Sequence, residues 1–208
     1  MEGQAFEGSM GSIILTKNGV YQAYITDGLS DTEVAKRFGV CRTAVVHFRK
    51  KHGIPSRIYS GEVGEGIVAC ELQRVDLVVI NMNMRSKIHP YDLLVNGVVR
   101  IDVKSATLYQ GHWRFSLSQK AETGIIEGDH YIRLNNGRMR KQFAKVCDFI
   151  ILCGIQEGES ALFVIPTKEI PETQQTICIN QSGLGKWWKW QNSFDSIKGV
   201  IKNRRLEK

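Results

Sequence analysis

Asp92, Asp102 and Lys104 are the residues of this sequence whose types and spacing best suit metal-dependent chemistry. Asp102 and Lys104 stand two positions apart in an apolar run, so on a β-strand both side chains project from the same face. The dipeptide Asn96-Gly97, the strongest short-range signal for a hairpin turn, joins this run to a shorter apolar run. Folding at that turn brings Asp92 back beside the end of the second strand. Two carboxylates and an ammonium group then converge, as a hard divalent cation and a water nucleophile require.

A third carboxylate is expected from the helix that precedes these strands. Apolar residues recur with helical spacing after position 62 and predict a helix over Glu62–Arg74. On that helix Glu65, Val68 and Leu72 lie along one side, so Glu65 stands beside core positions. For Glu65, and equally for Glu62, a simpler explanation is a first-turn glutamate that interacts with the helix dipole. The spacing to Leu72 favours Glu65 as the carboxylate that faces the hairpin.

Short apolar runs separated by turn signals predict a sheet after this helix. A further helix is expected within the C-terminal stretch 184–208, after three closely spaced tryptophans. Because helices come first and strands follow, the order indicates a mixed α/β catalytic domain behind a small all-α domain. We place the two domains at residues 1–57 and 58–208, with a flexible tail over 1–11. The predicted strands are Leu77–Ile80, Leu93–Val95, Val98–Val103, His112–Leu117, Tyr131–Leu134, Phe149–Ile155 and Ala161–Ile165.

The N-terminal domain is predicted to hold three helices, over 17–27, 31–38 and 42–52. Ser30 and Glu33 form a capping box that starts the second helix, and Gly39 ends it. This segment resembles the helix-turn-helix DNA-binding motif, with its small residue at Ala35, its turn glycine at Gly39 and its buried β-branched residue at Val45. The resemblance implies that the third helix enters a major groove.

The third helix is strongly basic. Seven Lys or Arg residues and no Asp or Glu lie between Lys36 and Arg57, as expected for a surface that faces phosphates. A small helical bundle with a solvated basic face would have the same composition. If the helix binds DNA, the side chains expected to contact it are those of Arg42, Thr43, His47, Arg49 and Lys50.

Composition indicates a soluble globular protein with an acidic partner. Apolar residues make up 42% and charged residues 24% of the chain, and its net charge is +7, for which nucleic acid is the commonest partner. The five cysteines are scattered and never spaced as C-x-x-C, so zinc and iron–sulfur sites are not expected, and each cysteine is interpreted as a small buried or half-buried apolar residue. We find no run of membrane-spanning length and expect a cytoplasmic location with no membrane partner.

The succession of a glutamate-bearing helix, a strand, Tyr91-Asp92, a hairpin and Asp102-Val103-Lys104 resembles the core of the PD-(D/E)xK nuclease superfamily. Its members include restriction enzymes, Holliday-junction resolvases and some homing endonucleases. The resemblance covers residues 61–170 approximately and implies the restriction-endonuclease-like αβββαβ core of that superfamily. Tyr91 stands where the superfamily name has proline, and the only nearby proline is one place earlier.

The resemblance also implies a mechanism. The superfamily hydrolyses phosphodiester bonds with a magnesium ion, for which manganese is expected to substitute, and it cuts double-stranded DNA. Lys104 would orient the attacking water or neutralise developing negative charge. The catalytic residues implied are Glu65, Asp92, Asp102 and Lys104, and the metal ligands are Asp92, Asp102, the Val103 carbonyl and, through water, Glu65.

The sequence therefore predicts a magnesium-dependent DNA endonuclease of the homing, mobile-element or restriction type, whose helix-turn-helix helps to select the site. Cutting both strands with one active site per chain suggests a homodimer. A resolvase-like or repair nuclease is the alternative enzyme. A simpler explanation of Asp102 and Lys104 is an ion pair on a surface hairpin, worth about 0–1 kcal/mol. An alternative function of another class is a DNA-binding regulator with an inert nuclease-like domain.

Overall fold

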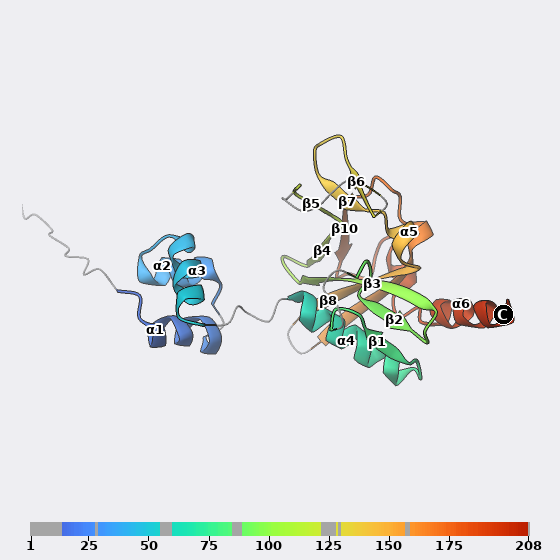
Figure 1. The fold of residues 1–208 in the computed structure, drawn as a ribbon, viewed down its shortest axis with the longest axis horizontal. Helices are drawn as coiled ribbons and strands as arrows, with labels where there is room; N and C mark the ends of the chain where they lie inside the picture. Colours follow the sequence, from blue (N-terminus) through green and yellow to red (C-terminus); the bar gives the residue numbers. More distant parts are fainter. Residues whose placement is uncertain are drawn as a thin grey trace, which may run out of the picture. The chain divides into compact units, whose positions relative to one another are not determined.

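The computed structural model describes residues 14–27, 29–54, 60–84, 89–121, 128, 130–156 and 159–207. The chain divides into two compact units, Met1–Tyr59 and Ser60–Lys208 (Figure 1). The tail predicted over 1–11 and the domain boundary predicted after residue 57 lie outside the described residues. These two statements therefore stay predictions.

The first unit contains the predicted helices. α1 (Lys17–Tyr21) continues into a π-helical segment, η1 (Gln22–Thr26), and α2 (Asp31–Phe38) and α3 (Arg42–Lys51) follow. The predicted capping box starts α2: the Glu33 N–H donates to Ser30 Oγ at 3.3 Å, and the Ser30 N–H donates to the Glu33 carboxylate at 2.7 Å. Gly39 ends the helix with φ of 64°, a left-handed conformation that glycine adopts without a Cβ clash.

The core of the first unit is small and apolar. Ala35 and Val45 are buried, as the spacing of the turn predicts, because the small side chain of Ala35 lets α2 and α3 approach closely. With them pack Val20, Ala23, Tyr24, Val34 and Ile54.

Arg49 corrects the sequence prediction. We expected its side chain to face DNA, but only 7% of the residue is exposed. Its guanidinium donates two hydrogen bonds to the Asp31 carboxylate, at 2.8 and 3.1 Å, and lies 4.3 Å from the centre of the Tyr24 ring. The pairing offsets the desolvation of a buried charge and ties α3 to the start of α2. Arg49 therefore belongs to the core of the unit.

The second unit is built on a five-stranded mixed sheet in the order β1-β2-β3-β8-β9. Its central pair, β3 and β8, is parallel, and the other neighbours are antiparallel. The predicted hairpin is confirmed: Leu93 pairs with Ile101, and Asn96 and Gly97 take φ of 48° and 70° at the turn. The strands are β1 (Val79–Asn81), β2 (Leu93–Val95), β3 (Val99–Thr107), β8 (Phe149–Gln156) and β9 (Glu159–Pro166).

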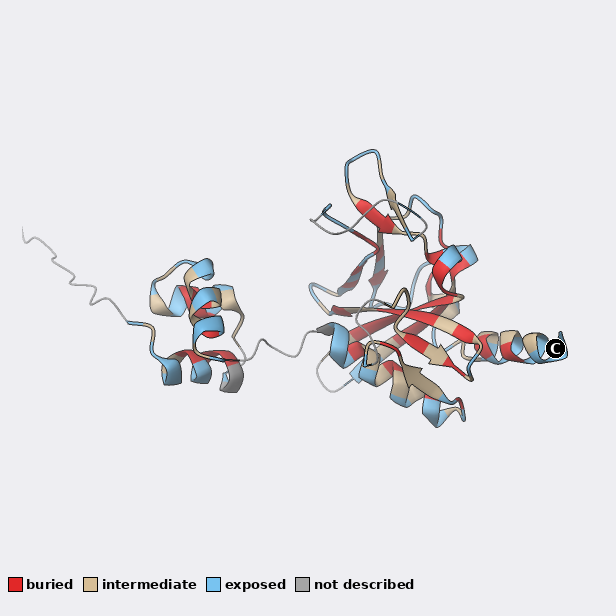
Figure 2. Cartoon of the chain, viewed as in Figure 1, coloured by how far each residue is buried: buried red, intermediate tan, exposed pale blue. Residues whose placement is uncertain are grey.

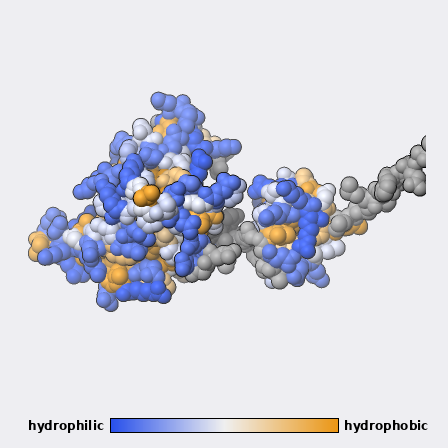
Figure 3. Space-filling model, turned by 180° about the vertical axis from the view of Figure 1, so that it is seen from behind, coloured by the Kyte–Doolittle hydropathy of each residue, from blue (hydrophilic) through white to orange (hydrophobic). Residues whose placement is uncertain are grey.

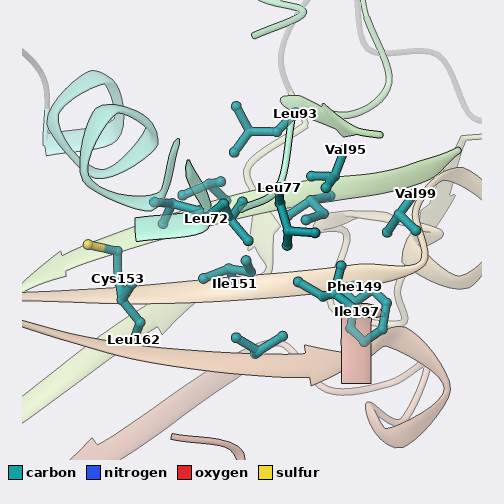
Figure 4. Packing of buried hydrophobic residues seen from close by; sticks show 14 of the residues in the cluster. Leu72, Leu77, Leu93, Val95, Val99, Phe149, Ile151, Cys153, Leu162 and Ile197 are labelled. Carbon is teal, nitrogen blue, oxygen red and sulfur yellow. The ribbon is translucent and has the colours of Figure 1, made fainter. Parts of the chain in front are cut away.

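The two faces of this sheet are covered differently. α4 (Ser60–Arg74) and α6 (Asp195–Leu206) cover one face, where Leu72 and Ile197 pack against residues such as Ile151 (Figure 4). The opposite face is covered by a two-stranded ribbon, β4 (His112–Ser116) with β10 (Thr176–Asn180), and by the short α5 (Phe143–Val146). Figure 2 shows the buried residues following the central strands. Both faces of the sheet are thus buried, which explains why β8 is apolar from Phe149 to Ile155.

A second, three-stranded sheet lies between β4 and α5 in the chain. It has the order β5-β7-β6 and consists of β5 (Ser118–Gln119), β6 (Tyr131–Arg133) and β7 (Met139–Lys141). Single 3-10 turns occur at η2 (Thr167–Glu169) and η3 (Trp188–Trp190), and the C-terminal helix begins only at Asp195. If β4 and this second sheet are left aside, the order α4, β1, β2, β3, α5, β8 contains the predicted αβββαβ succession, and the mixed α/β class is confirmed.

On the face shown in Figure 3, hydrophilic side chains predominate on both units. Within the described part of the chain, no helix has the length and apolar character needed to span a membrane.

Cys147 and Cys153 are buried as predicted, but Cys41, Cys70 and Cys178 are exposed, so the prediction of a buried or half-buried role is wrong for these three.

Candidate active site

β3 places Asp102 and Lys104 on the same face of the sheet, as their spacing predicts. Asp102 has no exposed surface, and its carboxylate forms ion pairs with the ammonium groups of Lys104 and Lys141. Lys104 Nζ also donates to the Val103 carbonyl at 3.3 Å. Burial alone would raise the pKa of Asp102, but the two lysines outweigh it and hold the pKa of this carboxyl below its ordinary value. Asp102 is therefore a carboxylate at neutral pH.

Lys104 is held in its charged form by the same arrangement. Burial opposes the charge, but the negative charges of Asp102 and Asp92 outweigh burial and raise the pKa of Lys104. Its side chain is 29% exposed. A charged lysine in this position can donate to an anionic ligand.

Lys141 was missed as a site residue from the sequence. It belongs to a group of basic residues, Arg138, Arg140, Lys141 and Lys145, that was not included among the predicted site residues. In the fold, β7 pairs Lys141 with Tyr131 of β6, and its ammonium group reaches both Asp102 and the Pro90 carbonyl, the latter at 3.0 Å. No local pattern could reveal this, because Lys141 and Asp102 are 39 positions apart in the chain.

Glu65 and Asp92 form a second group, joined by Asn83. The Asn83 side-chain amide donates to Glu65 at 3.0 Å and to Asp92 at 3.1 Å, and Asn81 donates to Glu65 at 3.3 Å. The other Asp92 oxygen accepts the Val103 N–H at 2.7 Å. Burial raises the pKa of Glu65, and the charge of Asp92 adds to this effect against the hydrogen bond from Asn83. Asn83 is a second site residue that sequence reasoning missed.

The alternative helix carboxylate lies elsewhere. Glu62 is exposed in the first turn of α4, while Glu65, one turn later, is half-buried and faces Asn81 and Asn83. α4 approaches β3 closely at Gly64, where an added Cβ would lie 1.8 Å from the Ser105 hydroxyl oxygen. This close approach fixes where Glu65 stands. The helix thus directs Glu65, and not Glu62, toward the hairpin.

The four predicted catalytic residues therefore form two neighbouring groups, Glu65 with Asp92 and Asp102 with Lys104. Among the residues described, no three carboxylate, imidazole or thiol side chains gather closely enough to form a ready-made metal cage. The donors still suit a hard divalent cation, because the carboxylates supply oxygen ligands. The predicted ligand set of Asp92, Asp102, Val103 and Glu65 stays a prediction.

On α3 the structure separates the remaining DNA-binding candidates from Arg49. Arg42, Thr43, His47 and Lys50 are exposed, while Val45 faces the core. Arg42 and Thr43 begin the helix and His47 follows about one turn later, so these side chains can share one surface. Their predicted contact with DNA is not tested by this geometry.

Comparison with protein-family models and with curated proteins gives no match. Among solved structures, the fold is similar to that of a bacterial homing endonuclease, I-Ssp6803I, with a TM-score of 0.53 and 13% sequence identity. The alignment covers 72% of this chain and 99% of that chain. At this identity the likeness concerns the fold alone. The chain thus has a mixed α/β fold shared with a homing endonuclease.

Proposed function

We propose that this protein is a divalent-cation-dependent DNA endonuclease that hydrolyses phosphodiester bonds. The observation that carries the proposal is the pairing of buried Asp102 with Lys104 beside the Glu65–Asp92 group, on a fold shared with a homing endonuclease. Four residues predicted from a motif come together from a helix, a bend and a strand, and an isolated surface ion pair does not account for that convergence.

Each residue has a separate role in the proposed reaction. Asp92, Asp102, the Val103 carbonyl and, through water, Glu65 would hold the cation, which we propose to be Mg²⁺, with Mn²⁺ able to replace it. When bound, such a cation polarises the scissile phosphate and lowers the pKa of a bound water. Lys104 would orient the attacking water or neutralise charge that develops on the phosphate. Asn83 would keep Glu65 and Asp92 oriented.

The first unit is proposed to select the site. Its exposed basic helix α3 would enter a major groove, with contacts from Arg42, Thr43, His47 and Lys50. A linker between the two units would raise the local concentration of DNA at the second unit. Cleavage of both strands would require two copies of the chain, since each carries one candidate site.

Plasmid cleavage tests the proposal. The wild-type protein should cut double-stranded DNA in the presence of Mg²⁺ or Mn²⁺ and not in EDTA. Asp92→Asn and Lys104→Ala should each lower the cleavage rate by about 100-fold or more, as expected when one preorganised charge is removed from an active site. Circular dichroism would verify that each variant is folded.

Glu62→Gln is the matched control for Glu65→Gln. Both changes remove one carboxylate from the first half of α4, but Glu62 is exposed and Glu65 faces Asn83. Glu65→Gln should slow cleavage strongly, and Glu62→Gln should leave it unchanged. If folded wild-type protein leaves every duplex and branched substrate intact with either cation, or if Asp92→Asn cuts normally, the endonuclease proposal is wrong.

A further inference from the structure

On its lysine side, the candidate site pairs one buried carboxylate with two ammonium groups. Asp102 is a single carboxylate with no exposed surface, yet two ammonium groups, from Lys104 and Lys141, are paired with it. One lysine would suffice to offset the buried charge. The second lysine adds a further ammonium group at this edge of the site.

The two lysines border a cavity. A cavity of about 330 Å³ is lined by Lys104 and Lys141 together with Ser116, Gln119 and Tyr131, and none of the described residues that line it is acidic. The Lys141 side chain is 14% exposed and that of Lys104 is 29% exposed, and both residues line the cavity. The seryl, amide and phenol groups of the wall add hydrogen-bonding capacity beside the two cations.

The two sides of the site therefore suit ligands of opposite charge. Glu65 and Asp92 lie together on one side, where both accept hydrogen bonds from the Asn83 side-chain amide. The lysines lie on the other side and open into the cavity. A ligand that complements the lysine side must be anionic, and the polyanion matching the net charge of +7 is nucleic acid.

We propose that this cavity binds a backbone phosphate of the DNA and that Lys141 is the residue that holds it. The inference rests on the proposed function and adds to it a phosphate subsite next to Lys104. Lys141 comes from the β5-β7-β6 sheet, which is inserted between β3 and α5 and lies outside the predicted motif. That sheet thereby supplies a DNA-contacting residue to the core site.

A structural role for Lys141 must be distinguished from this binding role. Lys141 also donates to the Pro90 carbonyl, so its loss can lower stability without any effect on DNA. The salt dependence of DNA binding distinguishes the loss of a phosphate contact from a loss of stability. Each phosphate neutralised by a protein cation contributes about −0.9 to the slope of log K against log salt concentration for duplex DNA.

The experiment measures binding of full-length protein to a fluorescent random-sequence duplex in EDTA, over a series of salt concentrations. Lys141→Gln should make the slope shallower by about 0.9 and raise Kd by roughly 10-fold at low salt, because one phosphate contact is lost. Lys141→Arg should restore most of the salt-dependence slope and most of the affinity, since the guanidinium keeps the charge and binds phosphate. The thermal unfolding midpoint of each variant is measured alongside.

Lys202→Gln is the matched control, because it removes the same charge from an exposed lysine on α6, across the sheet from the cavity. It should leave the slope unchanged. A wild-type slope in folded Lys141→Gln, with or without a lower unfolding midpoint, overturns the phosphate subsite. If wild type also cuts DNA in Mg²⁺, the proposed function survives that outcome. Wild-type protein that binds no DNA overturns both.

Discussion

Asp148, which directly precedes β8, shows how a single carboxylate connects three elements. Its oxygens accept the Arg100 N–H of β3 at 2.8 Å and the Arg204 guanidinium of α6 at 2.7 Å. Burial alone would raise the pKa of Asp148, but these donors outweigh it and hold the pKa of the carboxyl below its ordinary value. The charged form is thus the one that the folded state favours.

This arrangement predicts acid-sensitive stability. Because the pKa of Asp148 is lower in the folded state, its contribution is complete above the ordinary aspartate pKa and is lost as pH falls through the folded value. Asp148→Asn should lower the free energy of unfolding by about 1–3 kcal/mol at pH 7, as for other hydrogen bonds to charged groups. The difference from wild type should shrink at pH 3. Urea unfolding at both pH values measures it.

Glu169→Gln provides the comparison, because Glu169 forms a surface pair with Lys189 at 3.8 Å. A pair of this kind is worth about 0–1 kcal/mol, so the variant should stay close to wild type at pH 7. Equal losses of unfolding free energy for Asp148→Asn and Glu169→Gln would contradict a stabilising role of the hydrogen bonds that Asp148 accepts.

The candidate site could be predicted from the sequence only where local signals existed. Asn96-Gly97 fixed the hairpin, and strand alternation then placed Asp102 beside Lys104. Lys141 could not be found in this way, because it reaches Asp102 through an inserted sheet. Arg49 was misassigned for a related reason: its position on a basic helix suggested exposure, and its partner Asp31 lies 18 positions earlier in the chain.

Among the elements, the long apolar runs were predictable and the short polar strands were not. α4, the hairpin, β8 and β9 were all predicted within a few residues of their observed bounds. β7 consists of Met139–Lys141, which carries no strand signal of its own, and it exists because β5 and β6 pair with it. β10 was missed because its partner, β4, is distant in the sequence, so that tertiary pairing defines the strand.

Close packing between the ribbon and the sheet predicts the effect of a small change at Gly154. An added Cβ there would lie 2.7–2.9 Å from ring atoms of Trp113, which is 3% exposed. Gly154→Ala should therefore destabilise the second unit by about 1–3 kcal/mol, the usual range for overpacking. Thermal unfolding followed by near-UV circular dichroism would measure the loss.

Gly199→Ala is the control for backbone effects. Gly199 lies inside α6, and an added Cβ there meets nothing within 4 Å. Alanine should stabilise that helix by up to about 1 kcal/mol. Opposite signs for the two variants are expected, and a neutral Gly154→Ala would mean that Trp113 can move aside freely.

For the molecule as a whole, the main feature is that each unit has its own core. Val34 and Val45 belong to the core of the first unit, while separate clusters on the two sides of the sheet hold the second. Site selection and cleavage can therefore be altered independently, if the proposed division of roles is right.

Arg42→Ala combined with Lys50→Ala tests that division. Both side chains are exposed on α3, so their removal should raise Kd for DNA by about 10-fold or more, since individual DNA contacts are worth about 1–3 kcal/mol. The cleavage rate at saturating protein should not change. Electrophoretic mobility shift and single-turnover cleavage measure the two quantities separately.

Lys198→Ala with Lys202→Ala on α6 removes the same charge from the other unit and should affect Kd much less. An equal loss of affinity would attribute binding to net charge alone. A fall in the saturating cleavage rate of the α3 variant would contradict independent roles.

The placement of the aromatic residues has a practical consequence. All four tryptophans belong to the second unit, and Trp113 and Trp187 are buried there, whereas the described part of the first unit has only Tyr21 and Tyr24 as fluorescent side chains. Tyrosine barely absorbs at about 295 nm, so fluorescence excited there comes from tryptophan. This emission therefore reports on the second unit alone. Helical circular dichroism reports on both units. A difference between the unfolding midpoints of the fluorescence and circular dichroism curves would measure how independently the two units unfold.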